Sequence, residues 1–287
     1  MLVRIWGTLA VAVMALGLAG CGDDKSGGGK PAGGASGGGG NKPQQQEEIA
    51  EGDWGNLRIK FVYGGTPPAA KKIDLAGKTD AEYCGQHSPS VETLLVGPNG
   101  ELENVVVYLR PSDAPLHESY KAQEGKEVTL TNKGCRFEPH VRTLWTKYKL
   151  KIVNADERGH NTNAVFFAND DFNTQIPAGE FLIKELPKNE NLPMPISCGA
   201  HKWMKGHLLV RDNPYMGVSG SDGVLTIKDL PSGNWNFIVW HEGVGRVGEA
   251  KVKGALVFWK KGVANFAINK GDNDLGTVEI AAGQFTK

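Results

Sequence analysis

Residues 196–210 read ISCGAHKWMKGHLLV, and this stretch decides how the rest of the chain is interpreted. A cysteine, a histidine and a methionine stand at equal intervals at positions 198, 201 and 204, and an apolar run follows at once. Thiolate, imidazole and thioether are all metal ligands, and a short apolar run with a β-branched residue is typical of a strand. The stretch predicts a metal-binding loop in front of a strand; the alternative is a chance scatter of sulfur and imidazole.

The ligand types favour one metal in particular. A copper ion that alternates between Cu(I) and Cu(II) favours one thiolate, two imidazoles and a weak, distant thioether, because this set suits both oxidation states. Cys198, His201 and Met204 would supply three of these ligands, so the fourth must come from another segment. Residues 150–161 form a strand that runs into a turn and leads to His160, which makes His160 the candidate.

The body of the chain has the pattern of an all-β protein. Short alternating or β-branched runs are separated by Gly, Pro, Asn and Asp, and no window has a helical stripe longer than two turns. The pattern therefore predicts β-sandwiches built from short strands. We expect strands at 57–63, 105–109, 127–130, 148–153, 181–184, 207–211, 224–227, 235–240 and 251–258.

Two motifs together resemble the cupredoxin family, with a ligand loop most similar to that of amicyanin and more distantly to that of plastocyanin. They are GHNTN at 159–163 and CGAHKWM at 198–204, followed by GHLLV. The resemblance implies a Greek-key sandwich that binds one type 1 copper ion, with His160, Cys198 and His201 as strong ligands and Met204 as axial ligand. It also implies that Asn161 pins the loop by hydrogen bonding. Gly199 departs from the usual polar residue after the cysteine, which affects the surroundings of the thiolate but removes no ligand.

A second resemblance involves segments on either side of that region. GNLRIKFVYGGTPP and ENVVVYLRP near the start, and GVSGSDGVLTIKDLPSGNWNFIVWHEG at 217–243, resemble the carboxypeptidase regulatory-like, or transthyretin-like, sandwich. In that family the second and third of these strands are close in sequence, whereas about 100 residues separate them here. The interpretation is one sandwich made of 53–112 plus 212–287, with a cupredoxin domain inserted at 113–211.

The cysteines and the start of the chain predict an exported, lipid-anchored protein. Residues 1–20 have the pattern of a signal peptide that ends in LAGC, which resembles bacterial lipoproteins and implies lipidation of Cys21. Residues 21–52 are rich in glycine and are expected to form a disordered tether. Of the three remaining cysteines, Cys84 and Cys135 are the expected disulfide pair, because other pairings take Cys198 from its neighbours or leave two thiols free. The expected location is the bacterial cell envelope, facing the periplasm or at the outer membrane.

These observations favour an electron carrier. The chain has 32 basic and 32 acidic residues and no basic run with interleaved aromatics, which argues against nucleic-acid binding. We expect a non-enzyme that transfers single electrons between a donor and an acceptor protein that the sequence does not name, with an exposed His201 imidazole as the exit. The alternatives are a copper-buffering or delivery protein and a metal-free structural or adhesion module. The remaining histidines, among them His140, His207 and His241, are interpreted as structural.

Overall fold

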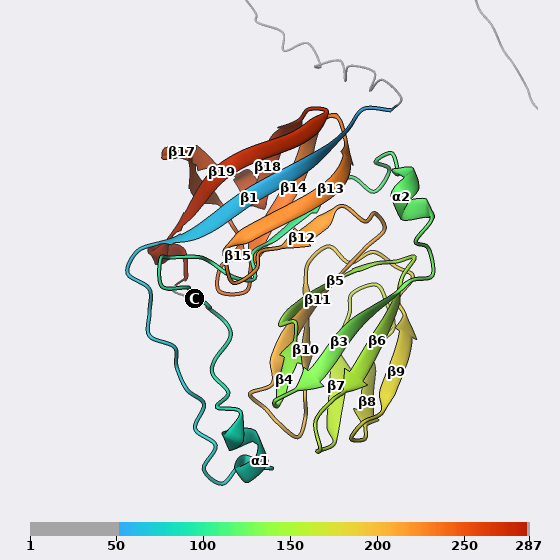
Figure 1. Ribbon diagram of the computed structural model, residues 1–287, viewed down its shortest axis with the longest axis vertical. Helices are drawn as coiled ribbons and strands as arrows, with labels where there is room; N and C mark the ends of the chain where they lie inside the picture. Colours follow the sequence, from blue (N-terminus) through green and yellow to red (C-terminus); the bar gives the residue numbers. More distant parts are fainter. Residues whose placement is uncertain (1–51, 286–287) are drawn as a thin grey trace, which may run out of the picture. The chain divides into compact units, whose positions relative to one another are not determined.

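The computed structural model describes residues 52–285, and the chain there is nearly all β. Its strands form four sheets, and the sheets lie in two pairs, which we call the first lobe and the second lobe (Figure 1). The predicted signal peptide at 1–20, Cys21 and all but the last residue of the tether at 21–52 lie outside the described residues.

The first lobe combines strands from both ends of the described chain. In one sheet the order is β13 (Val224–Pro231), β1 (Trp54–Gly64), β19 (Gly271–Ala281), β16 (Glu249–Val252) and β17 (Ala255–Phe258). In the other the order is β12 (Met216–Val218), β2 (Val106–Leu109), β14 (Gly233–His241) and β15 (Gly245–Arg246), and β18 (Val263–Ile268) also pairs with β14. Alternate residues of β1, namely Leu57, Ile59 and Phe61, point into a core that also contains Leu109 and Phe237 of the second sheet. Burial of these side chains between the sheets is the main stabilising contribution.

The second lobe is built from the chain between β2 and β12. One sheet has the order β5 (Val141–Trp145), β11 (Lys205–Arg211), β10 (Met194–Ser197), β7 (His160–Ala164) and β8 (Phe172–Ile176). The other has the order β4 (Arg136–Glu138), β3 (Glu127–Lys133), β6 (Lys149–Asn154) and β9 (Phe181–Glu185). Every second residue of β6 is buried, and its Leu150 and Ile152 share a core with Leu208 and Val210 of β11. The family to which each lobe belongs, and the domain boundaries read from the sequence, stay predictions.

The helices of the described chain are short. They are α1 (Ala81–Gln86), α2 (Glu118–Lys121), and the 3₁₀ helices η1 (Lys260–Gly262) and η2 (Ala282–Phe285). Within residues 52–285, none of the helices has the length and apolar character that crossing a membrane requires.

A third cluster of buried side chains joins the two lobes. Val106 and Ile238 of the first lobe pack with Val141 and Leu209 of the second. The buried Arg211 adds polar contacts, because its guanidinium donates hydrogen bonds to the carbonyl oxygens of residues 109 and 110 in the first lobe. The interface therefore has a buried apolar centre with specific polar contacts beside it.

One local prediction is wrong in detail, and one is confirmed. Residues 251–258 form the hairpin β16–β17 rather than one strand, because Gly254 has a φ of 84°, a conformation that turns the chain and that glycine adopts readily. The strand β6 stops at Asn154 and a turn leads to His160, the first residue of β7, which confirms the predicted path to His160.

The described cysteines include one disulfide, between Cys84 of α1 and Cys135 in the turn between β3 and β4. Cys198 is free and buried. The bond therefore ties the segment that contains α1, which belongs in sequence to the first lobe, to the second lobe.

We expect the double variant Cys84→Ser/Cys135→Ser to lose about 2–4 kcal/mol of unfolding free energy, because the bond closes a loop with a sequence separation of 51 residues. Urea denaturation of the metal-free chain measures the loss. Reduction of the unchanged chain should give the same loss, and reduction of the double variant should give no further loss. Equal stability of all three would show that the disulfide does not contribute.

Candidate metal centre

The loop at 198–204 is closed at its base by backbone hydrogen bonds. Strands β10 and β11 pair in antiparallel fashion up to Ser197 and Lys205, so the loop is the end of a hairpin. The N–H of Cys198 donates to the carbonyl oxygen of Met204 at 3.0 Å, and the N–H of Met204 donates to that of His201 at 2.8 Å. These bonds fix the backbone at all three predicted ligand positions of the loop.

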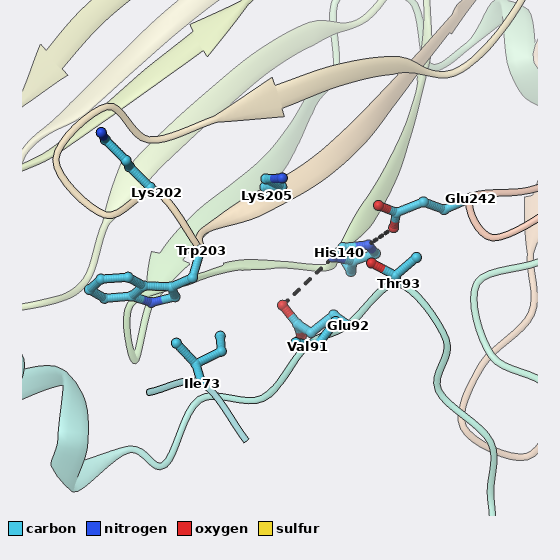
Figure 2. A pocket seen from close by; sticks show the side chains of 9 residues that line it. All are labelled: Ile73, Val91, Glu92, Thr93, His140, Lys202, Trp203, Lys205 and Glu242. Carbon is cyan, nitrogen blue, oxygen red and sulfur yellow. Dashed lines mark hydrogen bonds and ion pairs between the residues drawn. The ribbon is translucent and has the colours of Figure 1, made fainter. Parts of the chain in front are cut away.

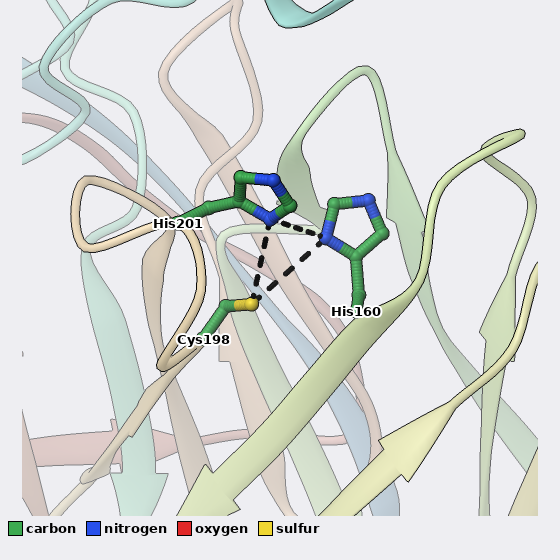
Figure 3. A group of neighbouring side chains, drawn as sticks. All are labelled: His160, Cys198 and His201. Atoms are coloured by element: carbon green, nitrogen blue, oxygen red, sulfur yellow. Dashed lines mark hydrogen bonds between the residues drawn. The ribbon is translucent and has the colours of Figure 1, made fainter. Parts of the chain in front are cut away.

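Strand β7 brings His160 to this loop. Its pairing with β10 matches Asn163 to Ser197, so the start of β7 lies beside the residues that follow Ser197. The Sγ of Cys198 lies 3.9 Å from Nδ1 of His160 and 3.6 Å from Nδ1 of His201, and the two Nδ1 atoms are 3.0 Å apart. Figure 3 shows the three side chains pointing toward one another from β7 and the loop. All three are buried.

These atoms fit a shared metal ion. An ion bonded to two imidazole nitrogens and one thiolate at about 2.0–2.3 Å in a plane holds the ligand atoms about 3.5–3.8 Å apart. The three measured separations lie within about 0.5 Å of this range. The donor set of one sulfur and two nitrogens is the one that suits copper in both of its oxidation states.

Met204, the predicted axial ligand, lies in the same buried core cluster as Cys198. Only 1% of its surface is exposed. Its backbone contacts the other loop ligands as described above, and its role as a fourth ligand stays a prediction.

The environment of Cys198 favours the thiolate. Burial raises the pKa of its thiol, but hydrogen bonds with the imidazoles of His160 and His201 and from the backbone N–H groups of Asn161 and His201 outweigh burial and lower it to about 5. A thiolate is the form that binds a metal. The site therefore holds its sulfur ligand ready at neutral pH.

Asn161, the residue expected to pin the loop, contacts it directly. The N–H of Gly199 donates to Oδ1 of Asn161 at 2.7 Å, and the Asn161 amide donates to Oδ1 of Asn173 at 2.6 Å. A Cβ atom at position 199 would lie 3.3 Å from that Oδ1, closer than side chains usually approach. Gly199 thus leaves room for the short hydrogen bond, which gives a physical reason for a glycine at this position.

Asp156 orients His160. Its Oδ2 lies 2.8 Å from Nε2 of His160, and its two oxygens also accept hydrogen bonds from the backbone N–H groups of Gly134 and Cys135 at 2.6 and 2.8 Å. Burial raises the pKa of Asp156, but the bonds from His160 and these N–H groups outweigh it and hold the pKa well below its usual range. Burial lowers the pKa of His160, yet its contacts with Asp156 and Cys198 raise it to about 9. Because Nε2 of His160 is hydrogen-bonded to the Asp156 carboxylate, Nδ1 of His160 faces the sulfur of Cys198.

His201 is not exposed, so the prediction that its imidazole forms the exit for electrons is wrong. It is 0% exposed, and its Nε2 lies 3.0 Å from Oδ2 of Asp80, at the start of α1. Asp80 has a φ of 52° and its side chain makes no capping hydrogen bond to α1. A left-handed conformation costs a non-glycine residue free energy and is kept where surrounding contacts require it. Asp80 contacts His201 in this conformation.

Sequence reasoning missed Asp80 and Asp156. Asp156 carried a signal, because it stands in the turn that leads to His160. Asp80 carried none, since more than 100 residues separate it from His201 and only the folded chain brings them together.

Comparisons with known proteins give similarity to solved structures only. No protein-family model matches the chain, and no curated protein sequence matches it. A copper-containing nitrite reductase from Thermus scotoductus SA-01 is 22% identical over 33% of this chain, with a TM-score of 0.29, and the chain spans only 27% of its length. A purple cupredoxin from Nitrosopumilus maritimus is 15% identical over 29% of this chain and 98% of its own, with a TM-score of 0.25. An amicyanin variant in the Cu(I) form is 9% identical over 37% of this chain and 98% of its own, with a TM-score of 0.27.

Proposed function

We propose that this chain is an electron carrier that binds one type 1 copper ion through His160, Cys198, His201 and Met204. The observation that carries the proposal is the convergence of one buried thiol and two buried imidazole Nδ1 atoms within 3.9 Å of one another. Bound copper would supply a one-electron couple between Cu(I) and Cu(II).

The residues around the ligands support a site whose geometry changes little. Asp156 fixes the ring of His160, Asn161 fixes the loop at Gly199, and the hydrogen bonds at the base of the loop fix Cys198 and Met204. Burial keeps water from the ligands. Rigid, dry surroundings keep reorganisation small when the charge of the site changes, which favours electron transfer over chemistry on a substrate.

Because Asp80 covers His201, we propose Trp203 as the route by which electrons reach the surface. Its ring lies 5.3 Å from that of His201, and it also lines a surface cavity of about 160 Å³. The partners would be a donor and an acceptor protein in the cell envelope. A lipid on Cys21 would anchor the carrier there, with residues 21–52 as the tether.

The test is a visible spectrum of the copper-loaded full chain, followed by cycles of reduction and reoxidation. The proposal expects an intense blue or violet band that disappears on reduction and returns on reoxidation. Tight binding of Cu(I) without reversible cycling would favour a copper-buffering or delivery protein instead. No copper binding would favour a structural module.

The variant Asp80→Asn should raise the reduction potential of the copper-loaded chain. The carboxylate of Asp80 stabilises the more positive oxidised state, whereas the amide keeps the shape and tolerates a positive φ without the charge. Because Asp80 is partly exposed, we expect about 1 kcal/mol, which is about 40 mV for one electron. Voltammetry measures the shift, and Glu82→Gln on the same helix is the control that should not change the potential. A fall in potential, or equal shifts in both variants, would contradict the assigned role of Asp80.

A further inference from the structure

A second group of metal-ligand side chains lies where the two lobes meet. Its members, which we call the interface cluster, are His140 and His207 of the second lobe and Glu242 of the first. Strand β5 runs parallel to β11 with Val141 opposite His207, and the N–H of His207 donates to the carbonyl oxygen of His140. Glu242 directly follows β14. Three separate segments therefore bring these metal-ligand side chains to one place.

The distances within the interface cluster suit one metal ion. Oε2 of Glu242 lies 2.6 Å from Nε2 of His140 and 3.8 Å from Nδ1 of His207. Two ligands at a tetrahedral angle around Zn²⁺ lie about 3.3 Å apart, between these two values. One ligand atom from each residue lies within 4.8 Å of the other two, so small side-chain movements complete the set.

Buried ring nitrogens without partners are the second observation that points to a ligand. Nδ1 of His207 is buried and has no hydrogen-bond partner. Nδ1 of His140 is also buried and has no hydrogen-bond partner, although it forms an ion pair with Glu92 at 3.6 Å. The side chains of His140 and His207 are 5% and 13% exposed. A buried polar atom without a partner costs about 1–3 kcal/mol. A metal ion bound to Nδ1 of His207 would remove that cost.

The charges around the interface cluster also favour a cation. Glu92 and Glu242 contact His140 from two sides, and burial together with the charge of Glu92 raises the pKa of the nearby Glu103. Arg136 offsets part of the charge through Glu92. Lys202 and Lys205 line the cavity beside these carboxylates.

A cavity gives the interface cluster access to solvent. It is lined by His140, Glu92 and Glu242 together with Trp203 and Lys205, and Figure 2 shows His140 between the two carboxylates at one side of it. Its volume of about 160 Å³ is several times the space of one water molecule. A water molecule can therefore reach the interface cluster as a fourth ligand.

We propose that His140, His207 and Glu242 bind a divalent ion of the zinc and copper class, in a site separate from His160, Cys198 and His201. Two imidazoles and one carboxylate are ligands that such ions prefer. The ion replaces the hydrogen bond between Nε2 of His140 and Oε2 of Glu242, and a proton on Nε2 is released to solvent. Because the ligands come from both lobes, the bound ion fastens the lobes to each other.

The test uses Zn²⁺ and the full metal-free chain with Cys198→Ala, which removes the thiolate of the other site. Calorimetric titration should show one zinc site, and adding His207→Gln or Glu242→Gln should lower its zinc affinity more than about 100-fold. Loss of a residue that only supports a metal ligand lowers the affinity about 10–100-fold, so a larger loss indicates a ligand. His87→Gln, a change at an exposed histidine outside both sites, should leave the affinity unchanged. Equal zinc affinity with and without His207→Gln would overturn the proposal.

A second measurement needs no change in the interface cluster. Nuclear magnetic resonance of the imidazole nitrogens should show that Zn²⁺ shifts the signals of His140 and His207 and leaves those of His87 and His117 unchanged. Shifts confined to His160 and His201 would overturn the proposal even if the variants fail to fold. The visible band of the copper-loaded chain depends on Cys198 and not on His207, so the two proposals fail independently.

Discussion

Replacing Cys198 with alanine is expected to abolish the intense visible band of the copper-loaded chain completely. The band of a type 1 site requires a thiolate bound to Cu(II), and Cys198 is the only free cysteine among residues 52–285. The variant retains both imidazoles, so weak binding of Cu²⁺ can persist without the colour. The visible spectrum and a copper titration, both on the full chain, measure the two effects separately.

Two further variants test whether the loss of the visible band is specific to Cys198 as a copper ligand. Ser197→Ala changes the neighbouring residue, which lies in β10 outside the predicted ligand set, and should keep the band. Met204→Leu keeps the apolar volume at a buried position and should keep an intense band at a changed wavelength, because an axial thioether is the weak ligand. A Cys198→Ala chain that still turned intensely blue would show that another sulfur binds the copper and that the ligand set is wrong.

The sequence predicted what local patterns encode. The interval between Cys198, His201 and Met204 requires only a short hairpin loop, and strands β10 and β11 supply it. The pair His160–Asn161 follows a turn, so its place beside the loop needs only one further strand pairing, between β7 and β10. The pairing of Cys84 with Cys135 followed from counting cysteines, and the disulfide is present. In each case the chain had few other loop structures, strand pairings or cysteine pairings to choose from.

The sequence could not predict what covers the site. Asp80 reaches His201 only because the segment around α1 leaves the first lobe and lies over the second. No periodicity or composition marks that path, since it is a long connection without regular alternation. The same holds for Glu242, which directly follows strand β14 of the first lobe and contacts His140 only where the two lobes pack.

The two histidines that were predicted to bind copper are linked through one continuous series of contacts. His160 contacts Asp156, and Asp156 accepts the N–H of Cys135. The disulfide continues to Cys84 in α1, and Asp80 just before α1 contacts His201. The disulfide and Asp156 therefore stabilise the same feature, which is the closed arrangement of the two imidazoles around the thiol.

The variant Asp156→Asn is expected to lose about 3–5 kcal/mol of unfolding free energy in the metal-free chain at pH 6, because it breaks a buried ion pair. The two oxygens of Asp156 accept from His160, Gly134, Cys135 and the hydroxyl of Tyr83. An amide offers one oxygen, and its NH₂ group would face donors that need an acceptor. Chemical denaturation followed by tryptophan fluorescence measures the loss.

The loss should depend on pH in a direction that the two pKa shifts determine. The lowered pKa of Asp156 contributes stability above its ordinary value of 3.8, and this is lost as the pH falls toward the folded value. The raised pKa of His160 contributes stability below its ordinary value of 6.5, and this is lost as the pH rises through about 9. The difference in unfolding free energy between the two chains should therefore be largest from about pH 4 to 6.5 and shrink toward pH 9.

Asp171→Asn is the control. It affects one hydrogen bond, which the N–H of Phe166 donates to the exposed Asp171, and should cost about 1 kcal/mol. A loss for Asp156→Asn that was equally small, or that grew between pH 6.5 and 9, would mean that the carboxylate does not hold a charged His160 in the metal-free chain.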